Sequence, residues 1–93
     1  MSRQVQFTTA FRRDYKREVK TDPNLDSLLT PVLTLLAEGL PLPRHNRDHA
    51  LTGAWRPARE CHLKPDLLLV YLLEGDDILR LQRLGSHTEL GLG

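Results

Sequence analysis

The sequence predicts an α+β fold in which two N-terminal helices pack on a small, largely antiparallel, twisted sheet. Three observations indicate this class. A short alternating segment opens the chain, two stretches of helical periodicity follow, and the remainder is rich in strand-like apolar runs. At 93 residues the chain is long enough for one core. We therefore expect a single domain over residues 1–93 that ends in a short tail or helical turn.

A short strand and a first helix are predicted at the N-terminus. Residues 3–7 alternate between polar and apolar side chains, which is typical of a strand. Thr8 or Thr9 suits the N-cap of a helix. The apolar side chains of that helix recur every four residues, at Phe11, Tyr15 and Val19. Its other faces are basic, and Asp22-Pro23 ends it.

A second helix is predicted over residues 24–38, where leucines and one valine make a broad apolar face. Gly39 is a suitable C-terminal stop. Pro31 lies inside this stretch, and proline removes an amide donor and clashes with the preceding turn. The sequence therefore predicts either a kink at Pro31 or a second segment that Thr30 caps.

Strands are predicted from Leu51 onward. Trp55 begins or ends a short one, and residues 58–63 form another. Residues 67–73 are apolar at every position, as expected for a central strand covered on both faces. Residues 78–84 form the last strand after a hairpin turn.

Charge is distributed unevenly, although the net charge is only +1. Residues 1–20 hold six Lys and Arg against two acids, and residues 41–66 hold five against three. The second block also carries three histidines. These blocks indicate a polyanionic partner, with ordinary solvated faces as the alternative.

The cellular compartment follows from cysteine usage and from the apolar runs. The chain has one cysteine, which excludes an internal disulfide and fits a reducing environment. Its longest apolar run is too short to cross a bilayer. We therefore expect a cytoplasmic protein.

Polar residues suited to proton transfer lie directly ahead of the central strand. His62 and Asp66 flank a tight turn, so the carboxylate is expected to orient the imidazole. A turn aspartate and a half-buried histidine, each bonded locally, are the alternative. Cys61 alternates with His62 along the strand and points to the other face, so we expect a buried thiol and not a nucleophile.

Arg83 stands in the last strand where a third apolar residue is expected after Leu79 and Leu81. It is either a rim residue or an anion clamp, because the guanidinium fork can hold two phosphate oxygens. Metal chemistry is not expected, since the four histidines lack a close pair such as H-x-x-x-H and the cysteine faces the core.

Four motifs resemble the YafQ-type branch of the RelE/ParE toxin superfamily. They are L-P-L-P (40–43), D-H-A-L-T-G-A-W (48–55), R-E-C-H-L-K-P-D (59–66) before an apolar strand, and R-L-G-S-H-T-E-L (83–90). The resemblance runs from about Phe7 to Leu90 and is specific because all four motifs are in register. Relatives commonly end in an aromatic residue, whereas this chain ends L-G-L-G.

This resemblance implies a RelE-like domain that acts as a bacterial type II toxin. Such a toxin cleaves messenger RNA in the ribosomal A site, where the 2′-hydroxyl of the RNA attacks the adjacent phosphate without a metal or cofactor. The implied partners are the ribosome with its mRNA and a DinJ/RelB-like antitoxin. Operator DNA would be bound only through the toxin–antitoxin complex.

The resemblance also implies roles for individual residues. The residues that match catalytic positions are His49, His62, Asp66, Arg83 and His87. His87 would be the general acid, and either His62, oriented by Asp66, or His49 would be the base. Arg83 would stabilise charge on the phosphorane-like transition state.

Basic residues and one aromatic are expected to contact RNA. The candidates for phosphate or ribosomal RNA contacts are Arg12, Arg13, Lys16, Arg17, Arg59 and Lys64. Trp55 either stacks on a base or belongs to the core. Two other functions stay open on this scaffold: a ParE-like toxin that binds gyrase without cleaving nucleic acid, and a degenerate toxin that only binds antitoxin as a corepressor.

Overall fold

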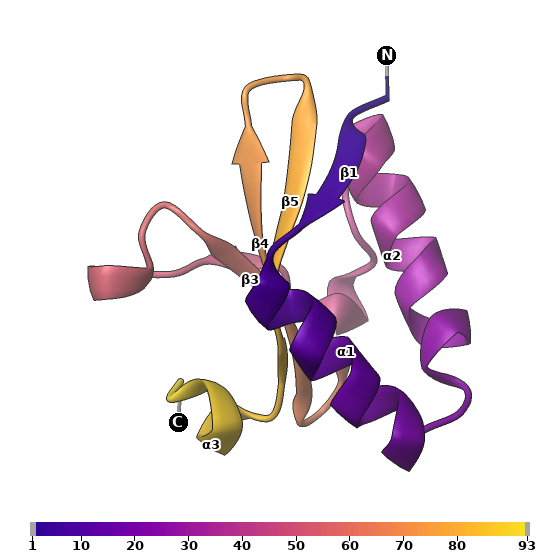
Figure 1. Cartoon of the computed structure of the whole chain (residues 1–93). Coiled ribbons are helices and arrows are strands. Elements are labelled where there is room, and N and C mark those ends of the chain that lie inside the picture. The colour runs from indigo at the N-terminus through magenta and orange to yellow at the C-terminus, as the bar shows by residue number, and fades with distance from the viewer. Residues whose placement is uncertain (1, 93) are drawn as a thin grey trace.

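A computed structural model of the chain describes residues 2–92 (Figure 1). The elements in chain order are β1 (Gln4–Phe7), α1 (Thr9–Thr21), α2 (Leu25–Glu38), the 3₁₀ turn η1 (Arg44–Asn46), β2 (His49–Ala50), the 3₁₀ turn η2 (Gly53–Trp55), β3 (Arg59–Lys64), β4 (Leu67–Glu74), β5 (Ile78–Gly85) and α3 (His87–Leu90). The predicted α+β class, with two N-terminal helices on a sheet, is confirmed.

One five-stranded sheet organises the molecule, in the order β1-β5-β4-β3-β2. All neighbouring strands are antiparallel except β1 and β5, which run parallel. The sheet is thus largely antiparallel, as predicted. Residues 67–71 of β4 are buried, which fits a central strand covered on both faces.

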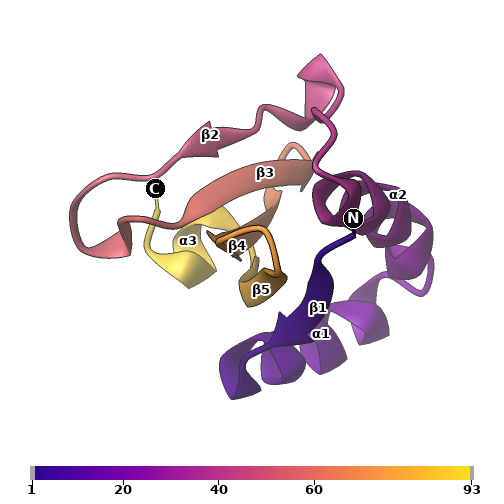
Figure 2. The same ribbon diagram turned by 90° about the horizontal axis from the view of Figure 1, so that it is seen from above.

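The two faces of the sheet are covered differently. Helices α1 and α2 lie against one face, and α3 lies on the other (Figures 1 and 2). The main core fills the helix side and contains Phe11, Leu25, Leu29, Val32, Leu36, Cys61, Leu63, Leu67, Leu69, Tyr71, Leu79, Leu81 and Leu84. A smaller core under α3 contains Ala58, Leu68, Val70 and Leu90. Because α3 is much shorter than α1 and α2, part of the second face is left for polar side chains.

Local signals explain the helix termini. Thr8 is the N-cap of α1, where its hydroxyl accepts a hydrogen bond from the amide of Phe11 at 3.0 Å. Gly39 ends α2 in the left-handed conformation, with φ of 74°. No helix within residues 2–92 is long and apolar enough to cross a membrane.

The structure decides two of the local predictions. Helix α2 continues through Pro31, so the alternative of a second segment capped by Thr30 is wrong, while the alternative of a kink stays a prediction. Proline has no amide hydrogen, so Pro31 cannot donate to the carbonyl of Ser27 one turn earlier. Both residues are exposed, so this carbonyl lies on the solvent side of the helix. Trp55 lies in η2 and not at the end of a strand, and the short edge strand is β2 instead.

A β-bulge in β5 also overturns the predicted face of Arg83. Tyr71 is opposite Leu81, but Val70, one residue earlier, is opposite Arg83. The extra residue, Gln82, reverses the alternation. Arg83 therefore lies on the face of α3 and not with the apolar residues of the main core. This bulge places the guanidinium on the same face as the predicted histidines.

Candidate active site

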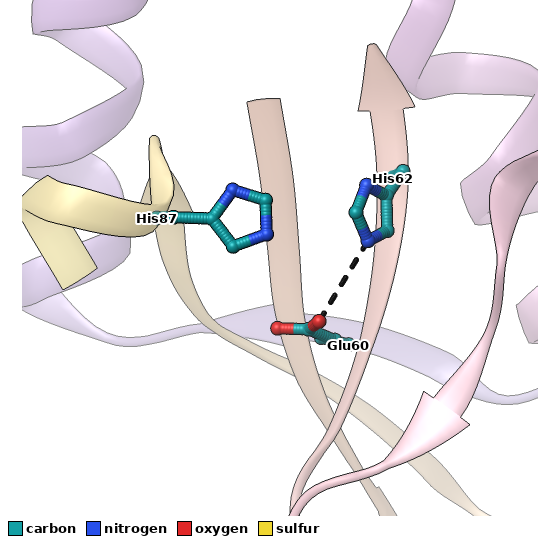
Figure 3. A group of neighbouring side chains, drawn as sticks. All are labelled: Glu60, His62 and His87. Carbon is teal, nitrogen blue, oxygen red and sulfur yellow. Dashed lines mark ion pairs between the residues drawn. The ribbon is translucent and has the colours of Figure 1, made fainter. Parts of the chain in front are cut away.

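A polar cluster occupies the sheet face opposite α1 and α2. Glu60 and His62 are two residues apart on β3, so both point to this face. His87, at the first position of α3, points toward them from the other side (Figure 3). The cross-strand row that contains Glu60 continues through Val70 to Arg83. The sheet and α3 thus bring three of the predicted residues, His62, Arg83 and His87, to one surface.

Distances within the cluster suit proton transfer. Glu60 contributes one carboxylate oxygen, and His62 and His87 contribute one ring nitrogen each. These three atoms lie within 4.8 Å of one another. The ring centroids of His62 and His87 are 5.5 Å apart, and those of His49 and His62 are 6.5 Å apart. Oε1 of Glu60 is 3.1 Å from Nε2 of His49 and 3.7 Å from Nε2 of His62. A carboxylate therefore stands between two imidazoles, with a third imidazole beside them.

Glu60 is absent from the site residues that the sequence predicts. Its residue is only 5% exposed, and Oε2 is buried without a hydrogen-bond partner within residues 2–92. A buried carboxylate oxygen without a partner costs stability, so its retention points to a functional purpose. The signal was available, because strand alternation puts Glu60 on the same face as His62.

Two histidines face Glu60 in the same way. In His49, Nδ1 is 2.8 Å from the carbonyl of Arg47, and Nε2 lies 3.1 Å from Oε1 of Glu60. In His62, Nδ1 is 3.3 Å from the carbonyl of Pro65, and Nε2 lies 3.7 Å from the same carboxylate oxygen, which is beyond hydrogen-bond distance. The backbone carbonyls thus orient both rings with Nε2 toward the carboxylate.

The predicted orientation of His62 by Asp66 is wrong. Asp66 contacts His87 instead: its Oδ1 accepts from the backbone amide of His87 at 3.0 Å and lies 2.7 Å from Nδ1 of that ring. These two hydrogen bonds, the backbone one foremost, hold the pKa of Asp66 below its ordinary value of 3.8. The carboxylate fixes the tautomer with Nδ1 as donor and leaves Nε2 of His87 for the cluster.

Helix α3 is built to hold His87 in place. The hydroxyl of Ser86 accepts from the amide of Glu89 at 3.1 Å, and Oε1 of Glu89 accepts from the amide of Ser86 at 2.9 Å. This capping box satisfies two amides at the start of the turn. Nε of Arg17 lies 3.3 Å from Glu89, and Leu90 is buried in the smaller core. The single turn is therefore anchored on both sides of His87.

Cys61 is buried in the main core, as predicted. Burial is the principal cause that raises the pKa of the thiol to about 12, so the thiolate nucleophile is not accessible.

The predicted RNA-contact residues fall into two groups. Arg12, Arg13 and Lys16 are exposed on α1. Three others are in ion pairs, namely Arg17 with Asp14, Glu18 and Glu89, Arg59 with Asp48, and Lys64 with Asp22. Trp55 is half-buried against the smaller core, which fits the core alternative. Their contacts to RNA stay predictions.

Comparisons with known proteins agree on one family. The sequence model of a family described as a bacterial toxin of type II toxin–antitoxin systems, YafQ, matches residues 3–91. The chain is 32% identical over 90 residues to the mRNA interferase toxin YafQ of Escherichia coli strain K12, with 97% of each chain covered.

Solved structures show the same likeness. A crystal structure of the E. coli DinJ–YafQ complex has a TM-score of 0.84 at 35% identity and covers 95% of this chain and 97% of that one. A crystal structure of a metal-bound toxin from Helicobacter pylori has a TM-score of 0.87 at 43% identity and covers 97% and 99%.

Proposed function

This chain belongs to the YafQ family of bacterial type II toxins, and we propose that it is an endoribonuclease that cleaves messenger RNA in the ribosomal A site. One observation carries the proposal: Glu60, His62 and His87 gather groups suited to proton transfer on one polar face of the sheet. The name of the E. coli relative, an mRNA interferase toxin, supports the same substrate. A gyrase-binding toxin on this scaffold would have no use for such a cluster.

The proposed reaction uses the 2′-hydroxyl of the message as the nucleophile. Its oxygen attacks the adjacent phosphorus while its proton passes to a base on the toxin. The bond between phosphorus and the 5′-oxygen then breaks, and an acid on the toxin supplies a proton to that oxygen. The products are a 2′,3′-cyclic phosphate and a 5′-hydroxyl, so no covalent bond to the protein forms.

The contacts described above suggest which residue takes each role. His62 or His49 accepts the proton of the 2′-hydroxyl, and Glu60 between them shares it. In its imidazolium form, with Nδ1–H held by Asp66, His87 gives the proton on Nε2 to the leaving 5′-oxygen and becomes the neutral ring protonated on Nδ1. Arg83 faces the same surface and stabilises the charge that develops on the phosphate.

We propose that the toxin binds the ribosome and cleaves the message that the ribosome holds. The exposed basic residues of α1, Arg12, Arg13 and Lys16, would contact ribosomal RNA through its phosphates. Such contacts are screened by salt, so binding to the ribosome should weaken steeply as ionic strength rises.

The experiment mixes purified toxin with ribosomes that hold a defined message and maps cleavage by primer extension. Wild-type protein should cut within the A-site codon, and His87→Ala should lower the rate at least about 100-fold. Thr88→Ala is the control, since Thr88 is the exposed neighbour of His87 on α3 and offers no group for proton transfer. Wild-type cleavage by His87→Ala would refute the role of His87, and growth arrest without cleavage would favour a gyrase-binding toxin.

We also propose that the reaction needs no metal ion of its own. Glu60, His62 and His87 offer donor types that zinc or copper accepts, and a related H. pylori toxin is described as metal-bound. An ion there would occupy the atoms that the proposed proton transfer uses. Chelator-treated toxin should therefore cleave at the wild-type rate, and added zinc should slow it. Activity restored specifically by zinc or copper would overturn metal independence.

A DinJ/RelB-like antitoxin is the proposed protein partner, as the solved DinJ–YafQ complexes of E. coli suggest. A groove of about 440 Å³ between β1, α1 and α2 is a suitable place for it. Its apolar lining includes Phe7, which is 48% exposed, and Arg12 and Lys16 lie at its border. This chemistry fits an amphipathic antitoxin segment with acidic residues at its edges. Operator DNA would then be bound by the complex and not by the toxin alone.

A further inference from the structure

Asp14 is a fully buried carboxylate on α1 that the proposed reaction does not use. It lies one turn after Phe11 on the helix face that packs against β5. Four donors reach it. Arg83 donates from Nε at 2.7 Å and from Nη2 at 3.4 Å, Arg17 donates from Nη1 at 3.2 Å, and the amide of Leu84 donates at 3.0 Å.

The fold explains why a carboxylate is needed at this point. β1 ends at Phe7, which pairs with Leu81, so the last residues of β5 have no strand beside them on that edge. Helix α1 takes over from there. The hydroxyl of Thr8 donates to the carbonyl of Gln82 at 2.9 Å, and Asp14 accepts from the amide of Leu84. α1 thus supports the part of β5 that carries the bulge and Arg83.

The hydrogen bonds divide the guanidinium of Arg83 into two edges. Nε and Nη2 are engaged by Asp14, whereas Nη1 has no hydrogen-bond partner in the described part of the chain. The side chain is 28% exposed, on the face that also carries Glu60. A guanidinium held along one edge has its remaining donors fixed in direction, which is what a phosphate-binding group requires.

We propose that Asp14 is a positioning residue for Arg83, holding one edge of the guanidinium so that the other edge meets the phosphate of the bound message. The inference rests on the proposed function, because it assigns Asp14 a part in the same reaction through Arg83. Asp14 itself is fully buried and is not one of the residues of the cluster.

The electrostatics of Asp14 fit this assignment. Burial alone would raise the pKa of its carboxyl, but the hydrogen bonds from Arg83 and Leu84 and the charges of Arg83 and Arg17 outweigh burial. The pKa is therefore lowered from 3.8, and the carboxylate stays charged at neutral pH. In many proteins, substituting apolar side chains for a buried ion pair leaves the free energy of unfolding unchanged or higher. A contribution to stability is therefore not a sufficient reason for the ion pair between Asp14 and Arg83.

The first test measures single-turnover cleavage on programmed ribosomes for Asp14→Asn, which keeps an acceptor for the amide of Leu84 but loses the charge opposite Arg83. We expect the maximal rate to fall about 10- to 100-fold, with the half-saturating ribosome concentration changed less than about threefold. In the Arg83→Ala background the same substitution should lower the rate no further. Additive losses would mean that Asp14 acts on the fold alone, and an unchanged rate would also overturn the inference. Asp26→Asn is the matched control, because Asp26 is an exposed carboxylate bonded to Tyr15.

The second test follows the Arg83 side chain itself by ¹⁵N relaxation of its Nε–H group and needs no activity. The signal should report an ordered side chain in the wild type and in Asp26→Asn, and a mobile one in Asp14→Asn. An ordered Arg83 in Asp14→Asn would overturn the inference. If the wild type does not cleave, the proposed function fails, while the relaxation data still decide whether Asp14 holds Arg83. A variant that loses the dispersed spectrum of a folded protein would assign Asp14 a structural role and overturn the inference.

Discussion

At the scale of single residues, the site depends on two buried carboxylates with opposite surroundings. Asp14 has a donor on each oxygen, whereas Glu60 has one oxygen between two histidines and one that has no hydrogen-bond partner within residues 2–92. A carboxylate with hydrogen-bond donors on both oxygens fixes the positions of those donors. A carboxylate that lacks a donor on one oxygen and lies beside imidazoles is suited to proton transfer. This difference in hydrogen bonding fits the proposed roles, in which Asp14 positions Arg83 and Glu60 shares a proton with the histidines.

Glu60→Gln tests this view of Glu60. Glutamine keeps the size of the side chain but cannot accept a proton at neutral pH, so the single-turnover rate should fall about 100- to 10,000-fold. The free energy of unfolding should stay the same or rise, because the substitution removes a buried acid whose Oε2 has no hydrogen-bond partner within residues 2–92. Urea unfolding measures the second quantity. Glu74→Gln, which alters a half-buried carboxylate paired with Arg80 outside the site, is the control. Full activity in Glu60→Gln would leave the histidines alone as the base.

At the scale of elements, the sequence predicts most helices and strands because their signals are local. The N-cap at Thr8, the stop at Gly39 and the apolar run of β4 each act within a few residues. The site pairs are not local. Asp66 and His87 are 21 residues apart, and Asp14 and Arg83 are 69 apart. Both depend on how α1 and α3 pack on the sheet, and the second also depends on a bulge that alternation alone does not predict.

Ser86→Ala tests whether α3 holds His87 for the reaction. The substitution removes the hydroxyl of the capping box and should cost about 0.5–2 kcal/mol within this turn. Because α3 is short and peripheral, its loosening should lower the cleavage rate more than the global unfolding free energy. Hydrogen exchange of the Glu89 amide would report the local change. Thr88→Ala, on the exposed side of α3, should leave both quantities unchanged. A rate equal to wild type in Ser86→Ala would mean that Asp66 alone orients His87.

At the scale of the whole molecule, the sheet separates two surfaces. The proposed RNA site lies on the face that carries α3, and the apolar groove lies on the helix side beside β1. The motifs in the sequence predict residues of the proposed RNA site, and the resemblance implies an antitoxin, but neither predicts the apolar groove or the side of the sheet on which it lies. That depends on the β1–β5 pairing and on the side from which α1 and α2 cover the sheet.

Phe7→Glu tests the separation of the two surfaces. A carboxylate in the apolar groove should weaken binding of the cognate antitoxin at least about tenfold, through lost burial and through repulsion of its acidic segment. The cleavage rate at saturating ribosome concentration should not change, because Phe7 lies outside the candidate active site, whereas ribosome binding should weaken, because the new carboxylate lies beside Arg12 and Lys16. Titration calorimetry measures the affinity, and Leu40→Glu, at an exposed leucine outside the groove, is the control. Unchanged affinity in Phe7→Glu would place the antitoxin elsewhere.

In the proposed reaction, a 2′-hydroxyl of the message is the nucleophile, and Glu60 and the histidines only transfer protons. The most direct measurement programs ribosomes with a message in which the nucleotide on the 5′ side of the cut carries a 2′-deoxy sugar. Its cleavage by the wild-type toxin is then compared with cleavage of the unmodified message. The deoxy message should bind in the same way and should not be cut at that position, and the unmodified message should leave a 2′,3′-cyclic phosphate. Cleavage of the deoxy message at the same position would mean that the nucleophile is not the 2′-hydroxyl.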